Sequence, residues 1–253
     1  EFDYNALSET DKYIYDHYTV PYNVEVVYRW NQGDVSSDDM RKNLVPPRES
    51  QVEPFLEMIE KVWVDTYTAE VGQQTLRSYI PKQILLVGSA SYNDDGSTTE
   101  GTAEGGRQIV LYSVNDFNFT LEQIQSYAHV MHHEFAHILH QNVEYDAEFE
   151  KITPSYSSSW MQMNDETART KGFITAYASS SADEDFAEMV SIMLTNSPED
   201  WDNMIESAGN ATAVEALRKK EAIVVAYMKN NWGVDMKDFQ KEVVAAIEAA
   251  VRN

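Results

Sequence analysis

The sequence predicts an α+β fold, with a small mixed sheet in the first half of the chain and a mainly helical second half. Short apolar segments with strand-like patterns all lie before residue 113, whereas apolar residues after residue 120 recur at the three- and four-residue spacing of helices. No repeat, low-complexity tract or linker divides the chain. We therefore expect one domain over residues 1–253, with a sheet-bearing lobe at 1–141 and a helical lobe at 142–253.

The composition narrows the classes of partner and ligand. A formal net charge of −23, from 19 basic and 42 acidic residues, argues against nucleic acid or an anionic lipid surface as a partner. The absence of cysteine excludes disulfides and Cys-based zinc sites, so histidines and carboxylates are the available metal ligands. No apolar segment is long enough to span a membrane. The chain begins at Glu1 without a methionine, so we expect that a targeting segment has been removed.

The first part of the chain predicts two helices and a strand. Residues 8–18 have the pattern of a short helix capped by Ser8. Apolar and polar residues alternate across residues 22–30, which predicts a strand buried on one face. Apolar residues then follow helical spacing, so residues 50–70 should form a long amphipathic helix that Gly72 ends.

Two strands and a turn should precede the next helix. Residues 84–87 are apolar but too few for a helix, which predicts a buried strand. Residues 93–96 predict a turn, because the calcium-loop alternative would place Thr102 where a bidentate Glu is required. The glycines within residues 101–106 match no phosphate-binding loop and should instead permit close backbone approach. Residues 107–112 should form a strand.

Helices account for most of the remaining chain. A helix over about residues 120–141 carries an apolar stripe, with Thr120 as its N-cap and Gln123 as a capping-box partner. Further helices are predicted at residues 164–171, at 182–195, after a cap at Ser197, at about 210–230 and at 235–251.

The helix over residues 120–141 contains His133-Glu134-x-x-His137, the signature of zinc peptidases. Residues four apart lie on one face of a helix, so two imidazoles can bind one metal while the Glu between them leans toward it. His129 and His140 are neighbours that could in principle reach the metal instead, although either is more often a supporting or surface residue. The motif therefore predicts a zinc site with Glu134 as a base.

A catalytic zinc ion takes three protein ligands, so the two histidines leave one position for a downstream carboxylate. Glu184 and Glu188 are four residues apart on the predicted helix over residues 182–195 and share a face opposite Phe186, so both can look toward a cleft. Tyr177 is a possible phenol donor at the rim. The candidate carboxylates are Asp165, Glu166, Asp183, Glu184, Asp185 and Glu188.

The segment from Tyr177 to Glu188 resembles the Tyr-x6-Glu-x-Phe-Ala-Glu segment of the catalytic domain of anthrax toxin lethal factor and related gluzincins. That segment supplies the catalytic Tyr and the zinc-binding Glu. The resemblance implies that Glu184 is the third zinc ligand and that Tyr177 stabilises the transition state. It also implies that Glu188 orients a metal ligand from behind.

A second resemblance extends over nearly the whole chain. Residues 21–30, 101–107 and the His133 helix with its continuation through Gln141 resemble the substrate import-associated zinc metallohydrolase lipoproteins, a metallopeptidase family. The resemblance implies a zincin-like fold and an outer-membrane lipoprotein of the Bacteroides group, encoded beside TonB-dependent nutrient importers. Components of that import system are then candidate partners. The lipid-bearing Cys is absent, as expected if this sequence starts after it.

These residues predict a zinc metallopeptidase that acts on peptide or protein substrates. Zn²⁺ held by His133, His137 and Glu184 would bind a water and lower its pKa, and Glu134 would take the proton and pass it to the leaving amine. Tyr177 would donate a hydrogen bond to the tetrahedral oxyanion.

The strand over residues 107–112 should be the sheet edge, where its unpaired backbone groups would bind an extended substrate. A rival function is an accessory protein of the import system that captures a peptide or glycan, because 15 Tyr and 5 Trp leave room for a stacking surface. The intact Glu134 favours the enzyme, since a binding protein needs no base. A structural zinc site is disfavoured because such sites are usually closed by four protein ligands.

Overall fold

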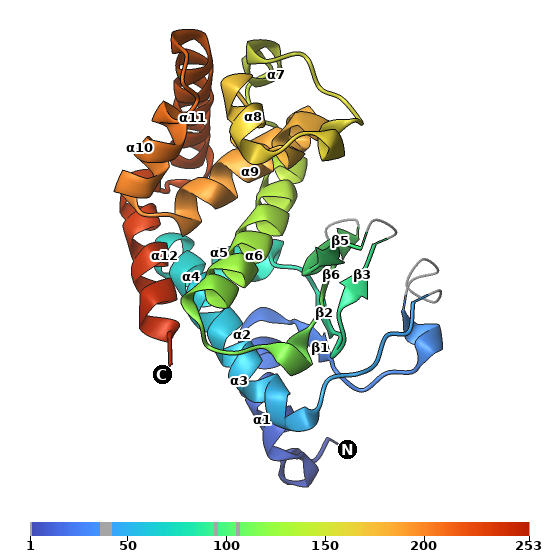
Figure 1. Ribbon diagram of the computed structural model, residues 1–253. Coiled ribbons are helices and arrows are strands. Elements are labelled where there is room, and N and C mark those ends of the chain that lie inside the picture. Colours follow the sequence, from blue (N-terminus) through green and yellow to red (C-terminus); the bar gives the residue numbers. More distant parts are fainter. Residues whose placement is uncertain (1, 36–41, 94–95, 105–106, 253) are drawn as a thin grey trace. The chain divides into compact units, whose positions relative to one another are not determined.

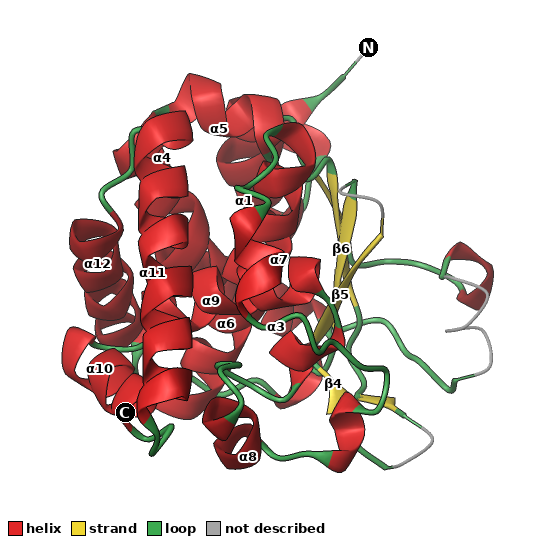
Figure 2. Cartoon of the chain, turned by 90° about the horizontal axis from the view of Figure 1, so that it is seen from above, coloured by secondary structure: helices red, strands yellow, loops and turns green. Residues whose placement is uncertain are grey.

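The computed structural model describes residues 2–35, 42–93, 96–104 and 107–252 (Figure 1). The chain forms two compact units. Unit 1 comprises residues 1–130 and 250–253, and unit 2 comprises residues 131–249. The predicted α+β class is confirmed, and the described strands, yellow in Figure 2, all belong to unit 1. The division into one domain with lobes at 1–141 and 142–253 stays a prediction.

Unit 1 contains a four-stranded mixed sheet in the order β1 (Glu25–Val27), β2 (Gln83–Leu86), β6 (Gln108–Leu111) and β5 (Gly101–Glu104). β1, β2 and β6 run parallel to one another, and β5 is antiparallel to β6. The prediction that residues 107–112 form the sheet edge is wrong, because β5 pairs along the outer side of β6. The short strands β3 (Ser91–Tyr92) and β4 (Thr98–Thr99) form a separate antiparallel pair.

The predicted strand over residues 22–30 is only partly correct. Tyr22 lies in the helical turn α2 (Val20–Tyr22), which ends where Asn23 adopts a left-handed conformation with φ of 57°. After β1, Tyr28 and Trp30 are buried although they lie outside the strand. The Trp30 indole N–H donates to the Leu86 carbonyl at 2.8 Å. One apolar cluster beside the sheet contains Trp30, Val35, Leu44, Leu85, Val87, Val110 and Tyr112.

The helices of unit 1 agree with the predicted positions. Ser8 caps α1 (Glu9–Ile14), and a π-helical turn over Tyr15–Thr19 extends it. The predicted helix over residues 50–70 consists of α3 (Glu49–Ile59), a π-helical turn over Glu60–Val64 and α4 (Asp65–Val71). Gly72 ends it with φ of 83°, as predicted, and α5 (Gln73–Tyr79) follows.

The glycine-containing segments are partly within the described residues. The amide of Gly96 donates to the Asn93 carbonyl at 2.9 Å, consistent with the predicted turn, although residues 94 and 95 lie outside the described residues. A side chain at Gly101 would collide with Val130, so close approach is confirmed there. Residues 105 and 106 lie outside the described residues.

The helix that carries the histidine motif is α6 (Leu121–Asn142). The Thr120 hydroxyl accepts a hydrogen bond from the Gln123 amide at 3.4 Å, which confirms the predicted cap. Gln123 Oε1 accepts instead from the Asn118 amide at 2.6 Å, so the reciprocal half of the capping box is displaced by two residues. No helix among the described residues has the length and apolar character that a membrane span needs.

Unit 2 is built from helices. The helices that follow α6 are, in order, α7 (Glu148–Ile152), α8 (Asp165–Thr170), α9 (Ala182–Thr195), α10 (Pro198–Glu206), α11 (Ala211–Trp232) and α12 (Met236–Ala250). The helices predicted after residue 160 are therefore confirmed. Side-chain caps at Asn164, Ser181, Ser197 and Asn210 start four of them by accepting a hydrogen bond from an amide of the first turn. In the core, the Phe186 ring contacts those of Phe149 and Tyr227.

Candidate metal site

Helix α6 brings the two motif histidines together. His133 and His137 lie one turn apart, as the four-residue spacing predicts. Their Nε2 atoms are 3.1 Å apart, and their rings meet edge to face at a centroid distance of 4.8 Å. His133 is buried and His137 is partly buried. The pair thus presents two nitrogen atoms to one point in unit 2.

Helix α9 supplies the carboxylate at that point. Glu184 Oε2 lies 2.9 Å from His133 Nε2 and 3.0 Å from His137 Nε2. The local cause is the start of α9, where the Ser181 hydroxyl accepts from the Glu184 amide at 3.2 Å and so fixes the first turn. Residues from two helices, about fifty positions apart in sequence, therefore converge at one point.

The three converging atoms match the donor set of zinc. Two imidazole nitrogens and a carboxylate oxygen are the usual protein ligands of a catalytic zinc site when cysteine is absent. Tetrahedral zinc with bonds of about 2.0–2.1 Å separates its ligand atoms by about 3.3–3.4 Å. The observed separations of 2.9, 3.0 and 3.1 Å are close to that size. His133, His137 and Glu184 therefore fit a zinc ion.

The electrostatics favour a positive charge at this point. Burial lowers the pKa of His133, but the hydrogen bonds to Glu184 and Glu188 outweigh burial and raise it to about 10. Burial raises the pKa of Glu184, yet its hydrogen bonds to His133 and His137 outweigh that effect and bring it far below the ordinary value. Surroundings that stabilise a proton at these atoms in this way also stabilise a metal cation there.

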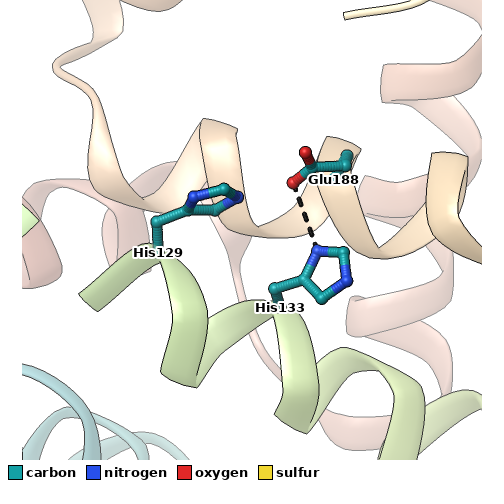
Figure 3. A group of neighbouring side chains, drawn as sticks. All are labelled: His129, His133 and Glu188. Carbon is teal, nitrogen blue, oxygen red and sulfur yellow. Dashed lines mark hydrogen bonds and ion pairs between the residues drawn. The ribbon is translucent and has the colours of Figure 1, made fainter. Parts of the chain in front are cut away.

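Glu188 lies behind His133 rather than beside Glu184. Its Oε2 is 3.2 Å from His133 Nδ1, the contact drawn as a dashed line in Figure 3. The carboxylate is buried, and its other oxygen, Oε1, accepts from the Thr175 hydroxyl at 3.0 Å. Ser191 adds a weaker hydroxyl contact to Oε2 at 3.3 Å. Glu188 is thus placed to orient the His133 ring.

The other histidines near the motif do not join the three atoms. His129 lies one helical turn before His133 on α6 (Figure 3), and the group formed by His133, His137 and Glu184 does not include it. His140 Nε2 contacts His137 at Nδ1, at 2.9 Å, on the opposite ring nitrogen from the one that meets Glu184. His140 therefore supports a motif histidine from behind.

Three of the alternative carboxylates have partners elsewhere. Asp165 accepts from the Ala176 amide at 2.8 Å, and Asp183 accepts from the Tyr145 hydroxyl at 2.6 Å. Asp185 pairs with a buried lysine. Of the six candidate carboxylates, the one that the structure brings to the two Nε2 atoms is Glu184.

Tyr177 lies beside the same group, and the charge of Glu134 acts on it. Tyr177 begins a 3-10 turn (Tyr177–Ser180), its side chain is 36% exposed, and its ring centroid lies 5.8 Å from that of His133. Burial raises the pKa of Tyr177, and the charge of Glu184 and a hydrogen bond with it raise the pKa further. Glu134 is partly buried, and its negative charge contributes to the raised pKa of both His133 and Tyr177.

The supporting contact of Thr175 was not predicted from the sequence. Thr175 bonds to Glu188, and nothing in its local sequence signals this role. The contact between His140 and His137 agrees with the supporting role that the sequence allowed for His140, because residues three apart share a helix face.

A His-Glu-x-x-His helix joined by a glutamate from a later helix is the arrangement of a zinc hydrolase site. Comparison with protein families agrees with it. A sequence model of the family described as "Putative zinc-binding metallo-peptidase" matches residues 4–237. The chain therefore belongs to this family, and zinc is its cofactor.

A solved structure has the same fold. The crystal structure of a protein from Bacteroides caccae, described as a putative zinc-binding metallo-peptidase, aligns with a TM-score of 0.83 and 33% sequence identity. The alignment covers 99% of this chain and 95% of the other. A comparison with curated proteins gave no match.

Proposed function

We propose that the protein is a zinc-dependent metallopeptidase that hydrolyses peptide bonds. The observation that carries the proposal is the convergence of His133 Nε2, His137 Nε2 and Glu184 Oε2 within 3.1 Å of one another. Glu134, which lies between the two histidines in the motif, is available as a base. Peptide or protein substrates follow from the family to which the chain belongs.

His133, His137 and Glu184 would hold the zinc ion through these three atoms. When bound, zinc supplies Lewis-acid activation of water and of the scissile carbonyl. Glu188 accepts the Nδ1 proton of His133, which leaves the lone pair of Nε2 free for the metal.

Two side chains would act on the substrate. The Glu134 carboxylate would accept a proton from the attacking water and deliver it to the leaving amine nitrogen. The Tyr177 hydroxyl would donate a hydrogen bond to the oxygen on which negative charge develops. The position of the Tyr177 ring beside His133 and its partly exposed side chain support this role.

The test compares zinc content with cleavage of a random peptide library. Glu134→Gln should keep zinc and lose at least about 100-fold in rate, because the amide cannot accept the proton. Tyr177→Phe should keep zinc and lose about 100-fold, because it lacks one oxyanion donor. Glu166→Gln is the matched control, since Glu166 lies on α8 and is not among the residues grouped around the candidate metal position, and it should cleave as the wild type does.

The outcomes separate the enzyme from the rival function. Full activity in Glu134→Gln would remove Glu134 from the mechanism. A zinc-loaded wild type that binds library peptides but cleaves none would favour the accessory binding protein.

The cellular location is a further part of this proposal. The resemblance of residues 21–30 and 101–107 to the import-associated lipoproteins supports an outer-membrane lipoprotein that works beside a TonB-dependent importer. Labelling of the native host with a radioactive fatty acid, followed by membrane fractionation, tests it. Recovery of unlabelled protein from the soluble fraction would contradict it.

A further inference from the structure

A second histidine contacts the His137 ring on the side away from Glu184. His137 Nε2 meets Glu184, and its other ring nitrogen, Nδ1, lies 2.9 Å from His140 Nε2. His140 is only 7% exposed. Both residues are on α6, three positions apart, so the helix itself sets their separation.

The His140 ring is enclosed by aromatic side chains. Its centroid lies 5.5 Å from that of Tyr145 and 5.9 Å from that of Phe186, both edge to face. Tyr145 is itself fixed, because it stacks on Phe186 at 4.5 Å and its hydroxyl donates to Asp183 at 2.6 Å. This enclosure restricts rotation of the His140 ring.

Proton counting assigns the tautomers of the pair. A neutral imidazole carries one N–H and one acceptor nitrogen. If His137 Nε2 is to offer its lone pair to a metal, its proton must be on Nδ1, which then donates to His140 Nε2. His140 can accept only if its own proton is on Nδ1. One arrangement of two protons therefore satisfies both rings.

The two motif histidines thus differ in what supports them. His133 donates to the charged carboxylate of Glu188, whereas His137 donates to a neutral ring. Partners of this kind fix the orientation and tautomer of a metal-binding histidine, and their loss typically lowers metal affinity by about 10–100-fold.

We propose that His140 is a positioning residue that holds His137 in its metal-binding tautomer by accepting the Nδ1 proton. The inference rests on the zinc site of the proposed function. It concerns zinc affinity, so it can be tested without any peptide substrate.

The experiment measures zinc affinity of the full chain by competition with a chromogenic chelator. His140→Leu removes the acceptor at similar volume and should weaken zinc binding about 10–100-fold. His140→Gln places an amide oxygen near the position of Nε2 and should restore affinity to within a few-fold of wild type. His17→Leu, which replaces a histidine of unit 1 paired with Glu60, is the control and should leave the affinity unchanged.

Each result bears on the proposal. Equal zinc affinity in the Leu and Gln variants, whether high or low, would show that the acceptor does not matter and would overturn it. Wild type that binds no zinc would instead overturn the proposed function, so the two failures are distinguishable.

Nitrogen-15 NMR of the zinc-loaded wild type gives a test without mutation. His140 should show a protonated Nδ1 and an unprotonated Nε2. The opposite tautomer would overturn the proposal, whatever the folding of the Leu variant.

Discussion

Two neighbouring residues of α9, Glu184 and Asp185, belong to different clusters of charged side chains. Glu184 meets His133 and His137, whereas Asp185 meets Lys220 of α11. Successive positions on a helix point about 100° apart, so one turn of α9 serves both clusters. The comparison shows how the same helix can carry a structural ion pair and a ligand site.

The Asp185–Lys220 cluster contains its own cation. Both side chains are 0% exposed, and Lys220 Nζ lies 2.6 Å from Asp185 Oδ2. Nζ also donates to the Gly172 carbonyl at 2.7 Å, and the Tyr156 hydroxyl donates to Asp185 at 2.9 Å. Burial raises the pKa of Asp185 to about 6, although Lys220 acts to lower it. One positive and one negative charge cancel.

The Glu184 cluster differs because the groups that Glu184 meets are imidazoles rather than a lysine. Its ligand atoms, two imidazole nitrogens and one carboxylate oxygen, lie close together, and the Glu184 side chain is 24% exposed. The chemistry of the partners, together with this exposure, therefore distinguishes the candidate metal site from the buried ion pair. The following experiments test this contrast.

Lys220→Met should have the largest effect on stability. It leaves Asp185 buried without its cation, which costs about 3–5 kcal/mol of unfolding free energy. Urea denaturation of the zinc-loaded protein measures the loss. The double variant Lys220→Met with Asp185→Leu should recover much of it, because no unpaired charge remains. A single variant as stable as wild type would mean that the pair is not needed for the fold.

Zinc binding should have the next largest effect on the unfolding free energy. This effect should depend on the Glu184 cluster and not on the Asp185–Lys220 pair. At a free concentration of about 100 times Kd, zinc should raise the unfolding free energy by about 2.7 kcal/mol. Glu184→Gln should lose this increment, whereas the double variant at Asp185 and Lys220 should keep it. Thermal unfolding with and without chelator measures both. An undiminished increment in Glu184→Gln would exclude Glu184 as a ligand.

Removal of a helix cap should have the smallest effect. Ser181→Ala and Ser197→Ala each delete an N-cap hydroxyl, of α9 and α10 respectively, and should each cost about 1 kcal/mol. Ser181 bonds to the amide of Glu184, so its loss should also weaken zinc binding. Ser197→Ala should not. Equal zinc affinities in the two variants would show that the cap does not help to place Glu184.

The local signals of the candidate site could be read from the sequence, whereas the choice of Glu184 among six carboxylates came from the resemblance. The four-residue spacing of His133 and His137 and the shared helix face of Glu184 and Glu188 follow from helix geometry. The edge position of the strand over residues 107–112 was wrongly predicted, since strand order depends on pairing between distant segments. The Asp185–Lys220 pair was not anticipated for the same reason, as neither residue carries a local signal of its partner.

The hydroxyl of Thr175 connects two parts of the proposed chemistry. It donates to Glu188 at 3.0 Å and accepts from the Ala178 amide at 3.1 Å, within the turn that begins at Tyr177. One oxygen atom therefore contributes both to the orientation of His133 and to the conformation of the loop that presents the phenol. A hydroxyl oxygen can donate one hydrogen bond and accept another, so serine should be the replacement at position 175 that keeps both contacts.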